Sequence, residues 1–275
     1  MNSSGPIGVF DSGYGGLTIL NELQKQLPAY DFLYLGDNAR APYGSRSFEV
    51  IYEYTWQAVE SLFEQGCSLV ILACNTASAK ALRNIQQLKL PQYDASKRVL
   101  GVIRPSVEEL SRHTHSKHIG VLATEGTVRS NSYAIELEKT APHINVTQHA
   151  CPMWVPLIEN QQFDTPGGLF FLQQDLIQLL EKDPQIDTIL LGCTHYPLIE
   201  KQLQALLPSH IELLAQGPLV AQSLKSYLER HPEMDIRCSK GGETHYLTSE
   251  NAAAFSEKAS VLIGKNIQAS HITLK

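Results

Sequence analysis

Short apolar runs alternate with longer amphipathic stretches along most of the chain. Short runs of apolar and β-branched residues are typical of buried strands, whereas apolar residues that recur every three or four positions are typical of helices. The pattern predicts strands over residues 7–10, 31–35, 68–73, 99–102, 118–123, 144–148 and 188–191. It predicts helices over residues 17–27, 48–65, 77–88, 106–113, 130–139, 170–181 and 198–207. Nearly continuous apolar strands separated by helices indicate an α/β fold with mainly parallel sheets that are flanked by helices.

Two short patterns occur once in each half of the chain. Residues 7–12 (IGVFDS) resemble residues 119–124 (IGVLAT), and residues 70–76 (VILACNT) resemble residues 189–195 (ILLGCTH). Their order and approximate spacing are the same in both halves. We therefore predict a duplicated α/β domain, while noting that two short matches can also arise by chance in any α/β protein.

The bulk composition excludes several classes of protein. The chain has 275 residues, of which 43% are hydrophobic and 18% charged, so it can build either one large α/β unit or two domains of ordinary size. A net charge of -6 leaves no broad basic surface for nucleic acid. No apolar run approaches the roughly 20 residues that span a bilayer, and the N-terminus lacks the features of a secretory signal. We expect a cytoplasmic protein without membrane or nucleic-acid partners.

Five cysteines are present, and two of them occupy equivalent positions. Their odd number, wide spacing and lack of a Cys-x-x-Cys pair argue against a disulfide framework and a structural zinc site, so we expect no metal. Such thiols are usually inert core residues, and Cys67, Cys151 and Cys238 are interpreted in this way. Cys74 and Cys193 differ because each follows a predicted strand and precedes a predicted helix in the duplicated pattern.

The ends of parallel strands are where ligands bind in open α/β sheets. A helix N-terminus there favours anions, binds carboxylates and is expected to lower the pKa of a nearby thiol from about 8.5. If the two halves face one another, Cys74 and Cys193 lie on opposite sides of one cleft. Two thiols so placed suit the inversion of a carbon stereocentre, since one removes a proton and the other returns a proton from the far side.

Two further features accompany the cysteines. Residues 11–16 (DSGYGG) form a glycine-rich turn that could cradle an anion, although glycine could equally be needed for the turn's conformation alone. The turn lacks the last glycine of a dinucleotide-binding motif, because Thr18 stands there. Asp11 is a candidate for orienting a substrate ammonium group or assisting a cysteine. His195 is either a surface histidine or a proton partner of Cys193.

Together these motifs resemble those of the glutamate racemases, in the aspartate/glutamate racemase superfamily. The matching segments span most of the chain in the family's order and comprise residues 7–18, 34–44, 73–78, 120–124, 151–159 and 191–198. The resemblance implies two pseudo-symmetric domains with the active site at their interface. It also implies that the C-terminal segment returns to the first domain, which gives a first domain of residues 1–98 plus 210–275 and a second of residues 99–209.

The resemblance also implies an activity. Members interconvert L- and D-glutamate without pyridoxal phosphate or metal and supply D-glutamate for the peptidoglycan of the cell wall, which maintains cell shape; relatives commonly form homodimers. By the family's pattern Cys74 removes the α-proton of D-glutamate and Cys193 that of L-glutamate. Asp11, Glu159 and His195 match polar residues that assist the thiols. The positions that match substrate contacts are Asp11, Ser12, Tyr43, Gly44, Asn75, Thr76, Thr124, Thr194 and His195.

Some alternatives remain open at this stage. Met153-Trp154 and the tail over residues 245–250 depart from the family's pattern. A racemase or isomerase for aspartate or another small amino acid would carry similar motifs, because the shared groups hold the α-carboxylate and the ammonium. A non-catalytic binding protein would have no use for both thiols. A pyridoxal-phosphate enzyme needs a Schiff-base lysine, and no predicted strand end carries one.

Overall fold

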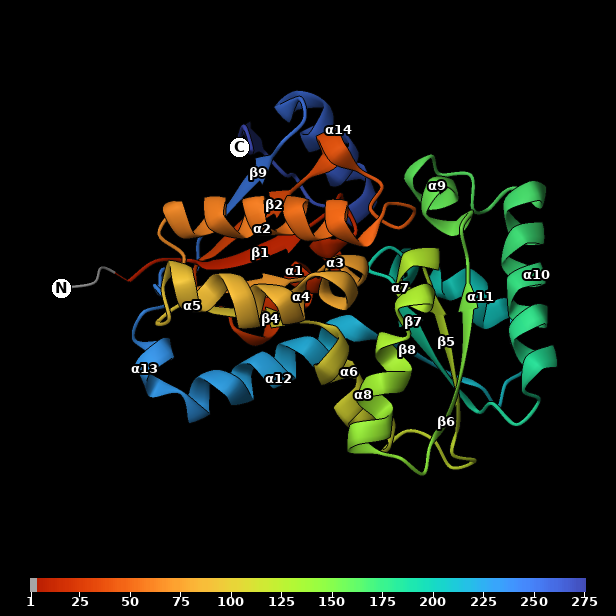
Figure 1. Cartoon of the computed structure of the whole chain (residues 1–275). Helices are drawn as coiled ribbons and strands as arrows, with labels where there is room; N and C mark the ends of the chain where they lie inside the picture. Colours follow the sequence, from red (N-terminus) through yellow and green to blue (C-terminus); the bar gives the residue numbers. More distant parts are fainter. Residues whose placement is uncertain (1–3) are drawn as a thin grey trace.

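The strands of the computed structural model, which describes residues 4–275, form two separate sheets (Figure 1). The first sheet has the order β10-β9-β2-β1-β3-β4 and the second the order β6-β5-β7-β8, and every pairing in both is parallel. The strands of the first sheet are β1 (Ile7–Asp11), β2 (Phe32–Gly36), β3 (Leu69–Leu72), β4 (Arg98–Gly101), β9 (Thr244–Thr248) and β10 (Ala269–His271). Those of the second sheet are β5 (His118–Ala123), β6 (Asn145–Ala150), β7 (Thr188–Gly192) and β8 (Glu212–Ala215).

Helices connect the strands and cover both faces of each sheet (Figure 1). Those that precede β6 in the sequence are α1 (Gly16–Gln26), η1 (Asn38–Arg40), α2 (Phe48–Glu64), α3 (Asn75–Lys80), α4 (Leu82–Asn84), η2 (Ile85–Lys89), α5 (Leu90–Tyr93), α6 (Ile103–Leu110), α7 (Glu125–Ser130) and α8 (Ser132–Thr140). Those that follow β6 are α9 (Trp154–Glu159), α10 (Pro166–Lys182), η3 (Tyr196–Ile199), α11 (Glu200–Leu206), α12 (Gln216–Arg230), α13 (Pro232–Asp235) and α14 (Ala252–Ile263). The predicted α/β class with mainly parallel sheets is confirmed.

The two halves repeat one strand order. In the first sheet β1 lies between β2 and β3, and β4 follows β3; in the second sheet β5 lies between β6 and β7, and β8 follows β7. The orders β2-β1-β3-β4 and β6-β5-β7-β8 are therefore equivalent, as the predicted duplication requires. Cys74 follows β3 and Cys193 follows β7, so the two thiols stand at matching strand ends.

The central strands of each sheet are buried on both faces because they are largely apolar. In β1, Ile7 and Val9 pack into the core on one face with α1 and α12, while Phe10 packs on the other face against α2. This alternation follows from the strand geometry, which turns successive side chains to opposite faces. Full burial of each such side chain stabilises the fold by roughly 1.5–3 kcal/mol. The resulting rigid frame fixes the strand ends, where the site lies.

The chain passes between the two sheets twice. β4 belongs to the first sheet and leads into α6, which packs against α8 of the second half. β8 belongs to the second sheet and leads into α12, which packs against α1 of the first half (Figure 1). Both strands thus extend a few residues past the borders predicted near residues 98 and 209, and the division into domains stays a prediction. None of the helices within residues 4–275 is both long and apolar enough to cross a membrane.

Candidate active site

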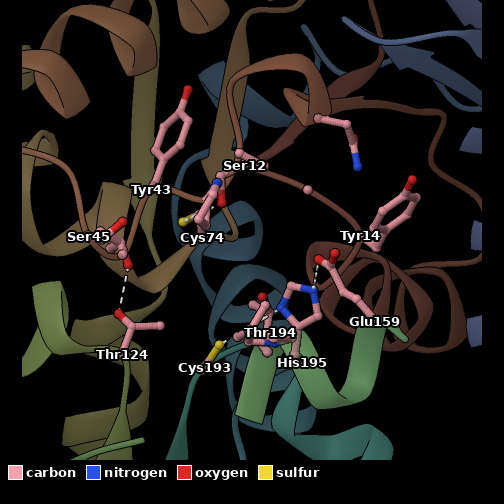
Figure 2. Close-up of a pocket in the computed structure, with 18 of the residues that line it drawn as sticks. Ser12, Tyr14, Tyr43, Ser45, Cys74, Thr124, Glu159, Cys193, Thr194 and His195 are labelled. Carbon is pink, nitrogen blue, oxygen red and sulfur yellow. Dashed lines mark hydrogen bonds and ion pairs between the residues drawn. The ribbon is translucent and has the colours of Figure 1, made fainter. Parts of the chain in front are cut away.

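A cavity of about 600 Å³ lies where the carboxyl ends of the strands of the two sheets meet (Figure 2). Ser12 follows β1 and Cys74 follows β3 in the first sheet; Thr124 follows β5 and Cys193 follows β7 in the second. Strand ends are where open α/β sheets bind ligands, since side chains and helix N-termini converge there. The volume suits a small molecule, within the usual range of ligand pockets.

The structure brings nearly all of the predicted site residues to this cavity. Those that line it are Ser12, Tyr43, Gly44, Cys74, Asn75, Thr76, Thr124, Glu159, Cys193, Thr194 and His195. Asp11 does not line it. Its buried carboxylate lies behind the cavity, where it accepts hydrogen bonds from the Gly13 N–H at 2.8 Å and the Thr194 hydroxyl at 3.3 Å.

The Cys74 thiol lies at the N-terminus of α3 in a buried environment. Its Sγ lies 3.4 Å from the Ser12 hydroxyl and accepts from the Ala77 N–H at 3.4 Å. Burial nevertheless raises the pKa of Cys74 to about 12, and the neighbouring Asp11 carboxylate acts in the same direction. The expectation that the helix N-terminus would lower this thiol pKa is therefore wrong, because desolvation outweighs the two hydrogen bonds. Cys74 is a neutral thiol at pH 7.

Cys193 lies beside an imidazole instead. Its Sγ is 3.9 Å from His195 Nδ1, and His195 Nε2 lies 2.9 Å from a carboxylate oxygen of Glu159 (Figure 2). Burial disfavours the His195 cation, but the hydrogen bonds to Cys193 and Glu159 and their charges outweigh it and raise the pKa of His195 to about 10. His195 is thus an imidazolium at pH 7, and its positive charge lies beside the Cys193 sulfur. Because Tyr196–Ile199 is a 3₁₀ turn, no α-helix N-terminus follows this thiol directly.

Glu159 forms ion pairs with both His195 and a lysine from the C-terminal part of the sequence. Its second carboxylate oxygen lies 3.3 Å from the Lys258 ammonium, which α14 supplies from the C-terminal part of the chain. Burial raises the pKa of Glu159, but the contacts with His195 and Lys258 more than compensate and hold it below its usual value. Glu159 therefore stays ionised and fixes the orientation of the His195 ring.

The glycine-rich turn is explained by close packing between the two halves of the molecule. Gly15 has ordinary helical φ and ψ angles of -59° and -38°, so the backbone does not require glycine there. A Cβ atom at Gly15 would lie 2.3 Å from Thr194 Oγ1 and 2.5 Å from His195 Nδ1. The Gly13 N–H of the turn donates to the Asp11 carboxylate and so does not face the cavity as a free donor. Gly15 thus lets the first half of the chain approach the Cys193 loop closely.

Two hydroxyl groups join the halves on the other side of the cavity. The Thr76 hydroxyl lies 2.9 Å from that of Thr124, and both line the cavity. Nearby, the Tyr43 hydroxyl donates to the buried Asp37 carboxylate, to which the Arg40 side chain also donates. This ion pair holds the loop that carries Tyr43 and Gly44 at the rim.

Several residues that line the cavity were not predicted from the sequence. Those beyond the predicted set include Tyr14, Asn38, Cys151, Val155, Glu250, Ala254 and Lys258. Glu250, Ala254 and Lys258 come from the tail, where neither motif nor periodicity distinguished them. Cys151 was interpreted as structural; it is buried, and burial raises its pKa well above the ordinary thiol value, yet it also borders the cavity.

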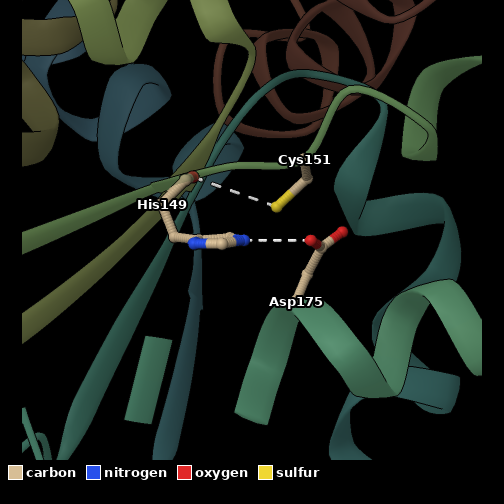
Figure 3. Close-up of side chains that lie close together, drawn as sticks. All are labelled: His149, Cys151 and Asp175. Carbon is tan, nitrogen blue, oxygen red and sulfur yellow. Dashed lines mark hydrogen bonds and ion pairs between the residues drawn. The ribbon is translucent and has the colours of Figure 1, made fainter. Parts of the chain in front are cut away.

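Cys151 belongs to the one set of three described residues with metal-ligand chemistry, together with His149 and Asp175 (Figure 3). Their candidate ligand atoms lie within 4.8 Å of one another. However, the Lys182 ammonium lies 3.0 Å from His149 Nδ1 and donates to it, which places the imidazole proton on Nε2, where it is donated to Asp175 at 2.9 Å. The nitrogen that faces Asp175 is thus occupied, and a cation stands beside the ring. This arrangement favours a salt-linked structural cluster over a metal site.

The sequence of residues 7–223 matches the model of the Asp/Glu/Hydantoin racemase family. The chain belongs to this family. Membership confirms the predicted resemblance and the predicted class of enzyme, a racemase.

Relatives of the family resemble the chain over almost its whole length. The chain is 43% identical over 271 residues to the glutamate racemase of Ruegeria sp. (strain TM1040), which covers 95% of this chain and 97% of the relative. It is 36% identical over 273 residues to the glutamate racemase of Streptococcus gordonii, with 98% of each chain covered.

Solved structures of the family show the same fold. Glutamate racemase isoform RacE1 from Bacillus anthracis superimposes with a TM-score of 0.88 at 33% identity, covering 100% of this chain and 99% of that chain. Glutamate racemase from Francisella tularensis in complex with D-glutamate gives a TM-score of 0.85 at 29% identity, covering 100% and 98%.

Proposed function

We propose that this racemase interconverts L- and D-glutamate by proton transfer between two thiols, without a cofactor. The observation that carries the proposal is that Cys74 and Cys193, at equivalent strand ends of a duplicated fold, line one cavity of amino-acid size. The relatives whose printed name is glutamate racemase support glutamate as the substrate. Racemisation of aspartate or another small amino acid is the alternative outcome of the test below.

The proton path follows from the two thiol environments. With L-glutamate bound, the Cys193 thiolate removes the α-proton and becomes a thiol, leaving a carbanion delocalised into the α-carboxylate. The Cys74 thiol then donates its proton to the opposite face of that carbon and becomes a thiolate, which gives D-glutamate. The reverse reaction uses the same groups in exchanged roles. The proposed starting state has a thiolate at Cys193 and a thiol at Cys74. The His195 imidazolium beside Cys193 favours the negative charge there, and burial keeps Cys74 neutral.

The polar residues assist these steps in different ways. His195 and Glu159 stabilise the Cys193 thiolate and orient the ring, and Asp11 acts on Cys74 by its charge and on Thr194 by its hydrogen bond. Ser12, Tyr43, Gly44, Asn75, Thr76, Thr124, Thr194 and His195 are the proposed substrate contacts. The resemblance further supports a cytoplasmic enzyme that supplies D-glutamate for peptidoglycan, acts as a homodimer and comprises two domains.

Circular dichroism of the purified protein tests the proposal directly. Without added cofactor or metal, L-glutamate should lose its optical activity, and L-aspartate, measured in parallel, should lose it far more slowly. Faster loss with L-aspartate would assign the alternative substrate. No change with either amino acid, while an authentic glutamate racemase reacts under the same conditions, would contradict the proposed function.

A further inference from the structure

A buried network of hydrogen bonds links the two segments that cross between the sheets, β4–α6 and β8–α12, to the substrate cavity. Its members are Ser106 in α6, Gln216 at the start of α12, Tyr133 in α8 and Asn75 at the start of α3. The exposed fraction of each is 2% or less. Of the four, Asn75 alone lines the cavity. We propose that Gln216 and Tyr133 are positioning residues that orient the Asn75 amide toward bound substrate; this rests on the proposed function of the cavity.

The direction of each hydrogen bond is determined from one fixed acceptor. The backbone carbonyl of Val102 can only accept, and the Ser106 hydroxyl donates its single proton to it at 2.7 Å. The Ser106 oxygen must therefore accept from its other partner, which lies at 2.8 Å and is the amide nitrogen of Gln216. This fixes the orientation of the Gln216 side chain, with its nitrogen toward Ser106 and its oxygen away from it.

The orientation is then passed to Asn75 along two routes. The second N–H of Gln216 donates to the Tyr133 hydroxyl at 2.7 Å, so the Tyr133 proton is donated onward to Asn75 Oδ1 at 2.6 Å. In the other route the Gln216 carbonyl oxygen accepts from Asn75 Nδ2 at 2.6 Å. Both contacts demand the same orientation of the Asn75 amide, since reversing it would place two donors or two acceptors together in a buried site.

One N–H of Asn75 remains after this accounting. The amide nitrogen has two protons, one of which is held by Gln216, and residues 4–275 provide no further acceptor for the other. Because Asn75 lines the cavity directly after Cys74, this N–H is a donor for an oxygen of the substrate. A carboxylate, which only accepts, is the group that such a donor recognises.

Because of the position of Gln216, the direction of the free Asn75 N–H depends on how the two sheets are placed relative to each other. Gln216 follows the last residue of β8, and Val102 follows the last residue of β4, so the anchor of the hydrogen-bond chain touches both passages between the sheets. Tyr133 belongs to the second half and Asn75 to the first. The Asn75 donor therefore has its defined direction only when both halves are correctly placed.

Two near-isosteric substitutions test the proposal. In Tyr133→Phe and in Gln216→Met the Asn75 amide loses its fixed orientation. KM for glutamate should therefore rise about three- to tenfold, which corresponds to the loss of one hydrogen bond to the substrate, while kcat stays within about twofold. A purely structural defect would instead lower kcat by reducing the folded fraction. Tyr30→Phe is the matched control, because that hydroxyl donates to Asp235 at the far ends of the strands, and its KM should not change.

A double-mutant cycle then asks whether the effect passes through Asn75. In an Asn75→Ala background, Tyr133→Phe and Gln216→Met should each change kcat/KM by less than about twofold, because the group they position is gone. Losses that multiply in this background, or an unchanged KM in a folded single variant, would overturn the proposal while leaving the racemase activity of the wild type intact. If Tyr133→Phe fails to fold, Gln216→Met alone tests the proposal. A wild type that does not racemise glutamate would overturn the proposed function and this inference together.

Discussion

At the scale of single residues, the two proposed bases are chemically unequal. Cys74 is buried beside the Asp11 carboxylate, and its pKa is raised to about 12, whereas Cys193 lies 3.9 Å from an imidazole whose pKa is raised to about 10. A pair with one thiolate and one thiol is what a two-base reaction needs at the start of each turnover. The sequence predicted the two thiols and His195, but the raised pKa values of Cys74 and His195 depend on burial and on contacts such as that with Glu159, which no local pattern reveals.

Replacing either thiol should abolish racemisation. Cys74→Ala and Cys193→Ala each remove one of the two proton-transfer groups, so kcat/KM for glutamate should fall by about 10²–10⁴-fold or more in both directions. Circular dichroism and thermal unfolding would be measured together. Cys238→Ala, which removes a buried thiol outside the cavity, is the matched control and should retain activity. Full activity in either of the first two variants would disprove the two-thiol scheme.

Removing the Glu159 charge should shift the alkaline limit of activity. The His195 cation is present below its pKa of about 10 and is lost as the pH rises through that value, and with it the support of the Cys193 thiolate. Glu159→Gln removes one of the groups that raise this pKa, so the pKa should fall toward its ordinary value of about 6.5 and the alkaline limb of kcat/KM should move to lower pH.

The pH profile of the wild type and the variant is the measurement. Because L- and D-glutamate have equal free energies, kcat/KM is the same in both directions for every variant, and either substrate serves. Glu233→Gln, in the exposed pair with His231, is the control and should leave the profile unchanged. An alkaline limb that does not shift in Glu159→Gln would show that Glu159 does not influence the reaction through His195.

At the scale of elements, the regular part of the fold could be predicted and the irregular part could not. The seven predicted strands are present within one or two residues, since apolar strands buried on both faces have a strong pattern. The predicted helix over 77–88 is divided into α3, α4 and a π-helical stretch η2, and a left-handed Asn131 with φ of 55° separates α7 from α8. Such breaks within a helix depend on tertiary packing, which the local sequence pattern does not show.

The C-terminal elements show the same limit. β9 lies between β2 and β10 on the first sheet, and only Thr248 of its residues is fully buried, so its alternation is weak. α14 has buried residues at Phe255 and Ala259 only. Neither was predicted, and α14 supplies Lys258 to the site. A contact between residues about 100 positions apart leaves no trace in a single sequence.

The glycine-rich turn provides a prediction at this scale. In Gly15→Ala the new Cβ would collide with Thr194 and His195, and a displacement of about 1 Å in the Cys193 loop should lower kcat/KM by about 10²-fold. Gly167→Ala, in α10 with no atom within 4 Å of the added Cβ, is the matched control and should keep both activity and stability. Wild-type activity in Gly15→Ala would show that the turn and the loop do not pack as described.

At the scale of the whole molecule, the duplicated sheet order explains why two thiols meet. The short repeats in the sequence marked Cys74 and Cys193 as equivalent, but equivalence alone does not place them in one cavity. Their meeting depends on the two passages between the sheets at β4–α6 and β8–α12 and on close contacts such as Gly15 with the Cys193 loop. Most of the predicted site residues therefore line one cavity, while Asp11 lies behind it and the tail contributes lining residues that were not predicted.

The most direct test of the two-thiol account is racemisation of L-glutamate in D₂O, stopped at low conversion. Mass spectrometry of the separated enantiomers should find one solvent deuteron in the D-glutamate formed and only protium at the α-carbon of the remaining L-glutamate, because one thiol removes the proton and a different thiol, exchanged with solvent, supplies the deuteron. D-glutamate that retains the original proton, or remaining L-glutamate that carries deuterium to the same extent as the product, would contradict two bases on opposite faces of the substrate.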